Sequence, residues 1–93
     1  MRKIERSSAF KRDYKRESKG RHSTTLDANL IPVLAASAND QPLEPKHRDH
    51  DLGGDWAGYR ECHVKPDLRL ISKMPDAATL RLARLGSHSE LFG

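Results

Sequence analysis

Apolar residues in the first twenty positions are spaced for one short helix. Phe10 and Tyr14 stand four apart, two serines precede them and Gly20 follows, which predicts a helix capped at both ends. A short strand or lead-in around Ile4 comes before it. The other face of this helix is basic.

A second helical pattern runs from about Thr25 to Ala38. Its apolar stripe consists of Leu26, Leu30, Val33 and Leu34. Pro32 lies inside the stripe, and a proline in a helix interior removes a backbone hydrogen bond at a cost of about 3 kcal/mol. We therefore expect this helix either to kink or to begin later than the stripe suggests.

The second half of the chain has strand character after an irregular segment. Residues 39–58 carry prolines, glycines and charges typical of a loop. Three strands are then predicted, Tyr59–Val64, Leu68–Lys73 and Thr79–Leu85, separated by proline- and aspartate-containing turns. Helices followed by a meander predict an α+β fold, with two N-terminal helices packed on a small, mostly antiparallel sheet whose other face is open. We expect residues 1–93 to form a single domain.

Alternation along the first strand separates core from open face. Cys62 and Val64 point one way and suit the core, whereas Tyr59, Glu61 and His63 point the other way. The last strand is less regular, because Leu80 and Leu82 share their parity with Arg84. Either this strand leaves the core at that point or a bulge turns it.

Composition limits the size of the core and the choice of partners. A chain of 93 residues with 35% apolar content is expected to be stable by only about 5 kcal/mol, so a partner covering exposed surface would stabilise it. The net charge is +4, and nine of the seventeen basic residues fall in the first 21 positions. Such a basic block suits phosphates of nucleic acid, or is simply a solvated helix face.

Cysteine use and hydropathy indicate a cytoplasmic protein. The single Cys62 excludes an internal disulfide, and the N-terminus has no apolar stretch of the kind that a secretory signal requires. The longest mostly apolar run, residues 30–36, is too short to span a bilayer. We expect no membrane partner.

Histidines are the residues that carry chemistry. His47, His50, His63 and His88 are distributed over loop, strand and tail. Two of them brought together could supply a general base and a general acid near neutral pH, although for any one of them alone an ordinary polar surface residue is the favoured interpretation.

Other site chemistries find little support in the residues. Cys62 and His63 are adjacent on a strand, so they point to opposite faces and cannot easily share a zinc ion. No nucleophile elbow, P-loop or dinucleotide-binding glycine motif occurs. We expect neither a metal nor a cofactor.

Two motifs resemble a known family. Residues 50–67 follow the pattern H-x-L-x-G-x-W-x-G-x-R-x-x-H-x-x-P-D, and residues 86–92 follow G-[ST]-H-x-x-L-F. Both patterns resemble the YafQ branch of the RelE/ParE toxin superfamily, whereas the N-terminal half matches only in length, helix pattern and basicity. The resemblance implies a compact α+β toxin that enters the ribosomal A site and cuts messenger RNA, held inactive by a DinJ-like antitoxin in a heteromeric complex.

The resemblance also implies the site residues. The family's active-site positions fall on His50, His63, Asp67, His88 and Phe92. Glu61 stands where the family has an aspartate, which preserves the charge but puts a tightly geometric role in doubt. Arg84 matches a basic position that could face the cleaved phosphate, although this assignment is weaker than that of the histidines.

These residues suggest metal-independent cleavage through the RNA 2′-hydroxyl. We expect His50 or His63 to act as base with help from Asp67 and Glu61, and His88 to act as acid. Arg84 and nearby lysines would stabilise the phosphate, and Phe92 would stack on a base, unless it is a hydrophobic plug that pins the tail. Ribosomal RNA would meet the basic helix through Lys11, Arg12, Lys15 and Arg16.

Two rival functions stay open at this point. A ParE-type toxin of the same fold poisons DNA gyrase without RNA chemistry and has no need of the matched histidines. A non-catalytic nucleic-acid-binding protein would explain the basic helix but not the histidines.

Overall fold

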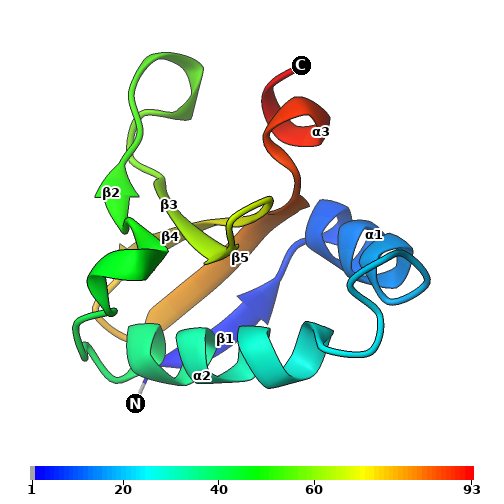
Figure 1. Cartoon of the computed structure of the whole chain (residues 1–93). Helices are drawn as coiled ribbons and strands as arrows, with labels where there is room; N and C mark the ends of the chain where they lie inside the picture. Colours follow the sequence, from blue (N-terminus) through cyan, green and yellow to red (C-terminus); the bar gives the residue numbers. More distant parts are fainter. Residues whose placement is uncertain (1) are drawn as a thin grey trace.

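The computed structural model describes residues 2–93 as helices and a single five-stranded sheet (Figure 1). The elements in chain order are β1 Lys3–Arg6, α1 Ser8–Glu17, α2 Leu26–Ala38, the 3-10 turn η1 Pro45–His47, β2 His50–Asp51, the 3-10 turn η2 Gly54–Trp56, β3 Arg60–Lys65, β4 Leu68–Asp76, β5 Thr79–Gly86 and α3 His88–Phe92. The strand order is β1-β5-β4-β3-β2. Only β1 and β5 are parallel. The predicted α+β class and mostly antiparallel sheet are confirmed.

Both predicted N-terminal helices are present. The Ser7 side chain caps α1 by accepting from the amide of Phe10 at 3.0 Å, and its hydroxyl donates to the carbonyl of Ala83 on β5. Helix α2 begins at Leu26 and runs through Pro32, so the later start that the proline suggested is wrong. None of the helices within residues 2–93 is long and apolar enough to cross a membrane.

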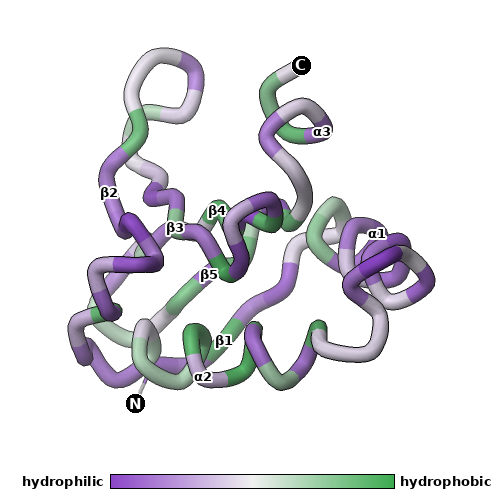
Figure 2. Tube along the Cα trace, in the orientation of Figure 1, coloured by the Kyte–Doolittle hydropathy of each residue, from purple (hydrophilic) through white to green (hydrophobic). Residues whose placement is uncertain are grey.

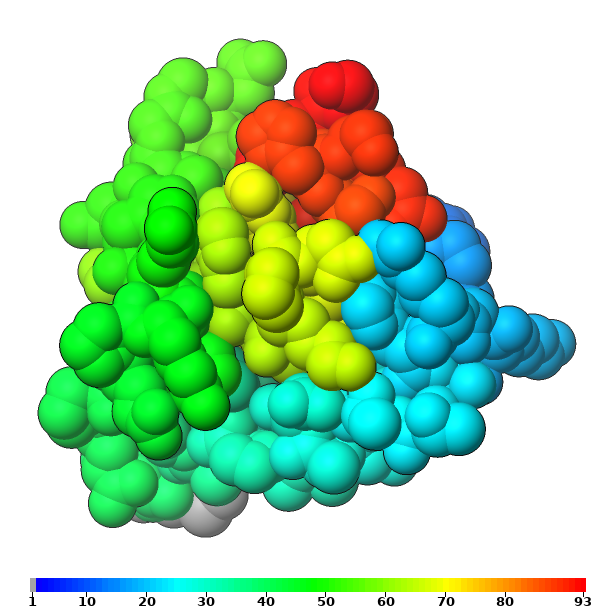
Figure 3. Space-filling view, viewed as in Figure 1, coloured from blue at the N-terminus to red at the C-terminus, as the bar shows by residue number. Residues whose placement is uncertain are grey.

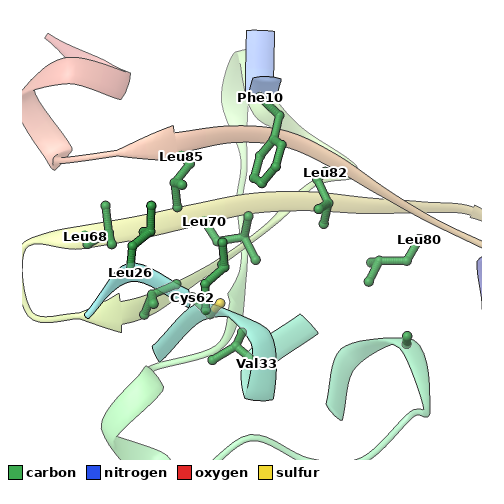
Figure 4. Packing of buried hydrophobic residues seen from close by; sticks show 12 residues of the cluster. Phe10, Leu26, Val33, Cys62, Leu68, Leu70, Leu80, Leu82 and Leu85 are labelled. Carbon is green, nitrogen blue, oxygen red and sulfur yellow. The ribbon is translucent and has the colours of Figure 1, made fainter. Parts of the chain in front are cut away.

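The core lies between the helices and one face of the sheet (Figure 4). Its largest fully buried side chains include Leu26 and Leu30 from α2, and Leu70, Leu80 and Leu82 from the sheet. Burial of each such side chain is worth about 1.5–3 kcal/mol. Cys62 and Val64 are also buried in this cluster, which confirms the assignment of their face of β3 to the core. Hydrophilic residues occupy much of α1 and the segment around β2 (Figure 2).

A β-bulge resolves the irregular alternation of β5. Ile71 pairs with Arg84 while the next residue, Ser72, pairs with Leu82, so one extra residue is accommodated in β5. Leu80, Leu82 and Leu85 are therefore all fully buried despite their different parity. Arg84 is turned away from the core, as the bulge alternative predicted.

Two segments expected to be irregular contain short elements. Within residues 39–58, β2 pairs with β3 through His50 opposite Glu61. The tail that carries His88, for which no helix was predicted, forms α3, because Ser87 and Glu90 form a capping box that starts it. The segment between β2 and β3 and helix α3 both project beyond the same end of the sheet (Figure 1).

Candidate active site

Glu61 lies at the centre of a group of titratable side chains. Its carboxylate is 3% exposed, and its Oε1 atom lies 3.6 Å from Nε2 of His50 and 3.6 Å from Nε2 of His63. His50 reaches it from β2 as the paired residue across the ladder, and His63 lies two residues farther along β3 on the same face. Two of the predicted histidines are thus brought together on one carboxylate.

Arg69 joins His88 to this group. Residue 69 pairs with His63 across β3 and β4, and its Nη1 atom lies 3.4 Å from Oε1 of Glu61. The same Nη1 donates to Nδ1 of His88 at 2.8 Å. The five side chains His50, Glu61, His63, Arg69 and His88 are called the histidine cluster below.

Helix α3 places two predicted site residues on one face. His88 and Phe92 are four residues apart with ring centroids separated by 5.0 Å, whereas Leu91 is buried and anchors the helix. The Phe92 ring also meets Trp56 edge to face at 6.3 Å. In the space-filling view, β3 and the β3–β4 turn lie between the green segment around β2 and the red α3 (Figure 3). An aromatic pair thus joins the two segments that flank the histidine cluster.

His63 is held in its neutral form. Its side chain is 13% exposed, and burial together with the positive charge of Arg69 lowers the pKa of His63, although Glu61 acts in the opposite direction. With a pKa below its usual 6.5, His63 is mostly uncharged at pH 7 and able to accept a proton.

The hydrogen bonds of His50 and His88 fix which ring nitrogen faces the site. Nδ1 of His50 donates to the carbonyl of Arg48 at 2.6 Å, which leaves Nε2 to exchange a proton beside Glu61. Nδ1 of His88 accepts from Arg69, since a guanidinium only donates, so the ring proton of His88 in this contact lies on Nε2.

Asp67 occupies a different position from the histidine cluster. It lies in the β3–β4 turn, where it forms an ion pair with Arg21 and lies 3.3 Å from Nε2 of His22. Burial and the nearby charges of Lys65 and Arg21 lower the pKa of His22. The structure therefore places Asp67 with basic residues of the α1–α2 connection.

Arg84 forms an ion pair with Asp13 of α1. Its Nε and Nη2 atoms donate to the carboxylate of Asp13 at 2.6 and 3.2 Å, and the amide of Leu85 donates to the same carboxylate at 3.0 Å. Burial alone would raise the pKa of Asp13, but these hydrogen bonds and the charges of Arg84 and Arg16 outweigh it and lower the pKa. The structure does not bring Arg84 to the histidines.

Arg16 differs from the other three basic residues predicted to meet RNA. Its guanidinium donates to Asp13, Glu17 and the carbonyl of Leu85 at 2.9–3.0 Å, and it pairs with Glu90 of α3 at 3.1 Å. Lys11, Arg12 and Lys15 are exposed on α1. Of the four predicted residues, only these three therefore have side-chain charges available to bind a polyanion.

Sequence reasoning missed Arg69, Trp56 and His22. Arg69 was detectable, because it follows the core residue Leu68 by one position and lies opposite His63 in the predicted hairpin. Trp56 belongs to the motif pattern and was noted only as part of it. No sequence signal connects His22 to Asp67, which is 45 positions away by number.

Cys62 lies on the opposite face of β3 from Glu61 and His63. Burial raises the pKa of Cys62 to about 12, which keeps the thiol protonated on the core side of β3. Within residues 2–93, no group of three or more His, Cys, Asp or Glu side chains is arranged to hold a metal ion.

Comparisons with known proteins cover the whole described chain. Residues 2–93 match the family described as the bacterial toxin of the type II toxin–antitoxin system, YafQ. The chain is 40% identical over 93 residues, spanning 100% of itself and 98% of its relative, to the mRNA interferase toxin YafQ of Escherichia coli strain K12.

Two solved structures share the fold over nearly their full lengths. YafQ in the E. coli DinJ–YafQ complex is 36% identical with a TM-score of 0.85, and all of both chains is covered. A metal-bound toxin from Helicobacter pylori is 42% identical with a TM-score of 0.82, covering 99% of this chain and 100% of that one. The resemblance of the two motifs is confirmed, and the chain belongs to the YafQ family of toxins of bacterial type II toxin–antitoxin systems.

Proposed function

We propose that this toxin is an mRNA interferase, a ribosome-dependent endoribonuclease that cuts messenger RNA in the cytoplasm without a metal ion. The observation that carries the proposal is the convergence of three histidines and an arginine around the buried Glu61. The name of the E. coli relative, an mRNA interferase, supports the same substrate. A gyrase poison would have no use for this convergence.

His63 acts as the general base. RNA carries its own nucleophile, so the enzyme needs only to remove the 2′-hydroxyl proton before the 2′-oxygen attacks the adjacent phosphorus. His63 is mostly neutral at pH 7 because its pKa is lowered, and Glu61 stabilises the imidazolium that forms when it accepts the proton. His50, on the same carboxylate, assists from β2.

His88 acts as the general acid. As the new bond forms between the 2′-oxygen and phosphorus, the bond from phosphorus to the 5′-oxygen breaks, and His88 supplies the proton that this oxygen needs. The products are a 2′,3′-cyclic phosphate and a 5′-hydroxyl end. Phe92, with Trp56 beside it, holds a base by stacking, an interaction worth about 1–3 kcal/mol.

Asp67 acts at a distance from the reacting atoms. Its partners Arg21 and His22 tie the β3–β4 turn to the α1–α2 connection, and this turn joins the strands that carry His63 and Arg69. Asp67 therefore supports the site by fixing the turn.

Translating ribosomes provide the test of this function. Added toxin should create new messenger ends carrying 2′,3′-cyclic phosphate. Their yield should be unchanged by EDTA at a concentration below that of magnesium, which captures transition metals and leaves the ribosome its Mg²⁺. DNA gyrase assayed in parallel should keep its activity. Gyrase inhibition without new messenger ends would contradict the proposal, and cleavage abolished by stripping metal from the toxin beforehand would contradict metal independence.

An apolar groove provides the site for the antitoxin. It lies between β1, α1 and α2, has a volume of about 430 Å³ and is lined by Ile4, Arg6, Phe10, Lys11, Tyr14, Asp27, Leu30, Ile31, Leu34 and Leu82. Ile31 at its edge is 57% exposed, although isoleucine is among the residues most often buried. Arg6 and Lys11 at the groove favour an apolar segment with acidic flanks, and the DinJ–YafQ complex supports a DinJ-like antitoxin as its source.

Substituting the exposed isoleucine tests this antitoxin site. Ile31→Asp should weaken antitoxin binding by at least about tenfold, because the charge would have to be buried in an apolar interface. Met74→Asp is the matched control, since Met74 is an exposed apolar residue on β4, away from the groove, at 39% exposure. Equal affinity of both variants and the unmutated toxin in calorimetry would place the antitoxin elsewhere.

A further inference from the structure

The guanidinium of Arg69 is only partly used by its neighbours. Its Nη1 atom lies between Oε1 of Glu61, at 3.4 Å, and Nδ1 of His88, at 2.8 Å. Its Nε atom is buried without a hydrogen-bond partner, a condition that within residues 2–93 it shares only with Nε of Arg2. Buried donors in native proteins are nearly always paired, so Nε of Arg69 indicates a partner that the protein itself does not supply.

Neighbouring arginines are used in a different way. Arg84 places both Nε and Nη2 on the carboxylate of Asp13. Arg16 uses Nε, Nη1 and Nη2 on carboxylates and a carbonyl. Arg69 keeps the Nε–Nη2 edge, the edge with which Arg84 binds a carboxylate, free of any hydrogen bond from residues 2–93.

The chemistry of this edge and its position specify the partner. Two parallel N–H groups of a guanidinium match two oxygens of a phosphate, and a bidentate contact of this kind is strong and directional. The arginine lies between His63, opposite it on β3, and His88, with which it forms a hydrogen bond. An anion bound there would lie between the proposed base and the proposed acid.

We propose that Arg69 binds the scissile phosphate of the messenger and stabilises the charge that develops on it during cleavage. This inference rests on the proposed function and assigns to Arg69 the role that sequence reasoning gave to Arg84. A small movement of the side chain towards the phosphate brings its Nε–Nη2 edge into contact and takes Nη1 away from His88.

The same movement prepares His88 for its role. While Nδ1 accepts from Arg69, the single ring proton is on Nε2, and giving it up would leave the ring without a proton on either nitrogen. When Arg69 turns to the phosphate, Nδ1 takes a proton from solvent and the ring becomes an imidazolium. The imidazolium then gives its Nε2 proton to the leaving 5′-oxygen and returns to the neutral ring, so the protons balance.

Substituting Arg69 tests the inference directly. On substrate-loaded ribosomes, Arg69→Gln should lower the single-turnover rate by about 10²-fold, the usual loss for one donor to a developing oxyanion. Arg69→Lys should recover part of this loss because it keeps the charge but not the fork. Arg81→Gln is the matched control, since Arg81 is an arginine on the neighbouring strand β5, paired with Glu5, and its rate should be unchanged. Rates are divided by the folded fraction, measured by titration with antitoxin.

A substrate with sulfur at the leaving 5′ position separates Arg69 from His88. This substrate needs little protonation of the leaving group, so His88→Ala should cleave it at nearly the unmutated rate. Its phosphate still needs Arg69, so the Arg69→Gln deficit should persist. An unmutated rate for Arg69→Gln on ordinary RNA, or a deficit that disappears with the sulfur substrate, would overturn the phosphate role. A normal rate of His88→Ala on ordinary RNA would instead overturn the proposed acid, whatever the result for Arg69.

Discussion

Two ionic networks lie side by side in this toxin and use arginine in opposite ways. At the junction of α1, β5 and α3, the buried Asp13 binds Arg84 through both carboxylate oxygens, and Arg16 connects the same carboxylate to Glu90. In the histidine cluster, one carboxylate oxygen of Glu61 is shared by two histidines and Arg69, at 3.4–3.6 Å from each. Both carboxylate oxygens of Asp13 therefore accept short hydrogen bonds, whereas the contacts of Glu61 are longer and share one oxygen.

The difference separates structural charges from functional ones. A carboxylate that accepts several short hydrogen bonds contributes stability and has no capacity left for a substrate. A loosely shared carboxylate can follow the protons that move during a reaction. The junction nevertheless serves the site, because Glu90, besides pairing with Arg16, accepts from the amide of Ser87 and so holds the first turn of the helix that begins with His88.

Removing the charge of Asp13 should give the largest loss of stability. Asp13→Asn breaks a buried ion pair and leaves Arg84 uncompensated, so we expect a loss of about 3 kcal/mol in the free energy of unfolding. For a domain of this size that lowers the melting temperature by roughly 12 °C or more. Glu61→Gln is the comparison in the other network and should change the melting temperature much less. Equal losses in calorimetry would remove the distinction between the networks.

The cleavage rate should depend on the charge of Glu61. Glu61→Gln removes the charge proposed to support the imidazolium of His63, so we expect messenger cleavage to fall by roughly tenfold, a difference of about 1.4 kcal/mol. Glu61→Asp keeps the charge and should be nearly silent. If Glu61→Gln and Glu61→Asp reduce the single-turnover rate by the same factor, the position of the carboxylate rather than its charge determines its role.

Acid should act on the two networks in different pH ranges. The pKa of His63 is below 6.5, so protonation of this proposed base should reduce the cleavage rate as pH falls through the lowered value. The pKa of Asp13 is below 3.8, so the stability that its ionised form provides is present above pH 3.8 and lost as pH falls through the lowered value. A pH series of rate and of unfolding free energy should therefore show loss of activity well before loss of this part of the stability. Simultaneous loss of both quantities would contradict the assignment.

The smallest expected effect concerns the surface of α1. Replacing Lys11, Arg12 and Lys15 with Gln should weaken ribosome binding and reduce its salt dependence, because fewer counterions are released on binding when fewer phosphates are contacted. Arg16→Gln should leave the salt dependence unchanged, since its guanidinium is occupied by Asp13, Glu17 and Leu85. If the triple variant keeps the unmutated salt slope in sedimentation assays, the ribosome is met by another surface.

Local patterns in the sequence were sufficient to predict most of the fold and part of the site. Alternation on β3 correctly separated Cys62 and Val64 from Glu61 and His63, and of the two explanations left open for the parity conflict at Arg84, the structure shows the bulge. The capping box of α3 was present as a Ser followed three residues later by a Glu, but the sequence analysis did not use it to predict a helix in the tail.

Contacts between distant positions were beyond these patterns. The bond between Asp13 and Arg84 joins residues 71 positions apart, and nothing local indicates that a helix aspartate is buried against a strand arginine. His50 reaches Glu61 through a strand of only two residues, which is too short to leave a periodic signal. Both contacts depend on how separate elements pack together.

Cleavage by His88→Ala toxin tests the central claim most directly. The measurement is the single-turnover rate on ribosomes loaded with ordinary messenger and with messenger carrying sulfur at the leaving 5′ position, with antitoxin binding confirming the fold. A general acid contributes roughly 10²–10⁴ in rate, so the variant should lose at least about 10²-fold on ordinary messenger and almost nothing on the sulfur substrate. The same loss on both substrates would contradict the account, because His88 would then bind or support the messenger and the acid would have to be His50 or His63.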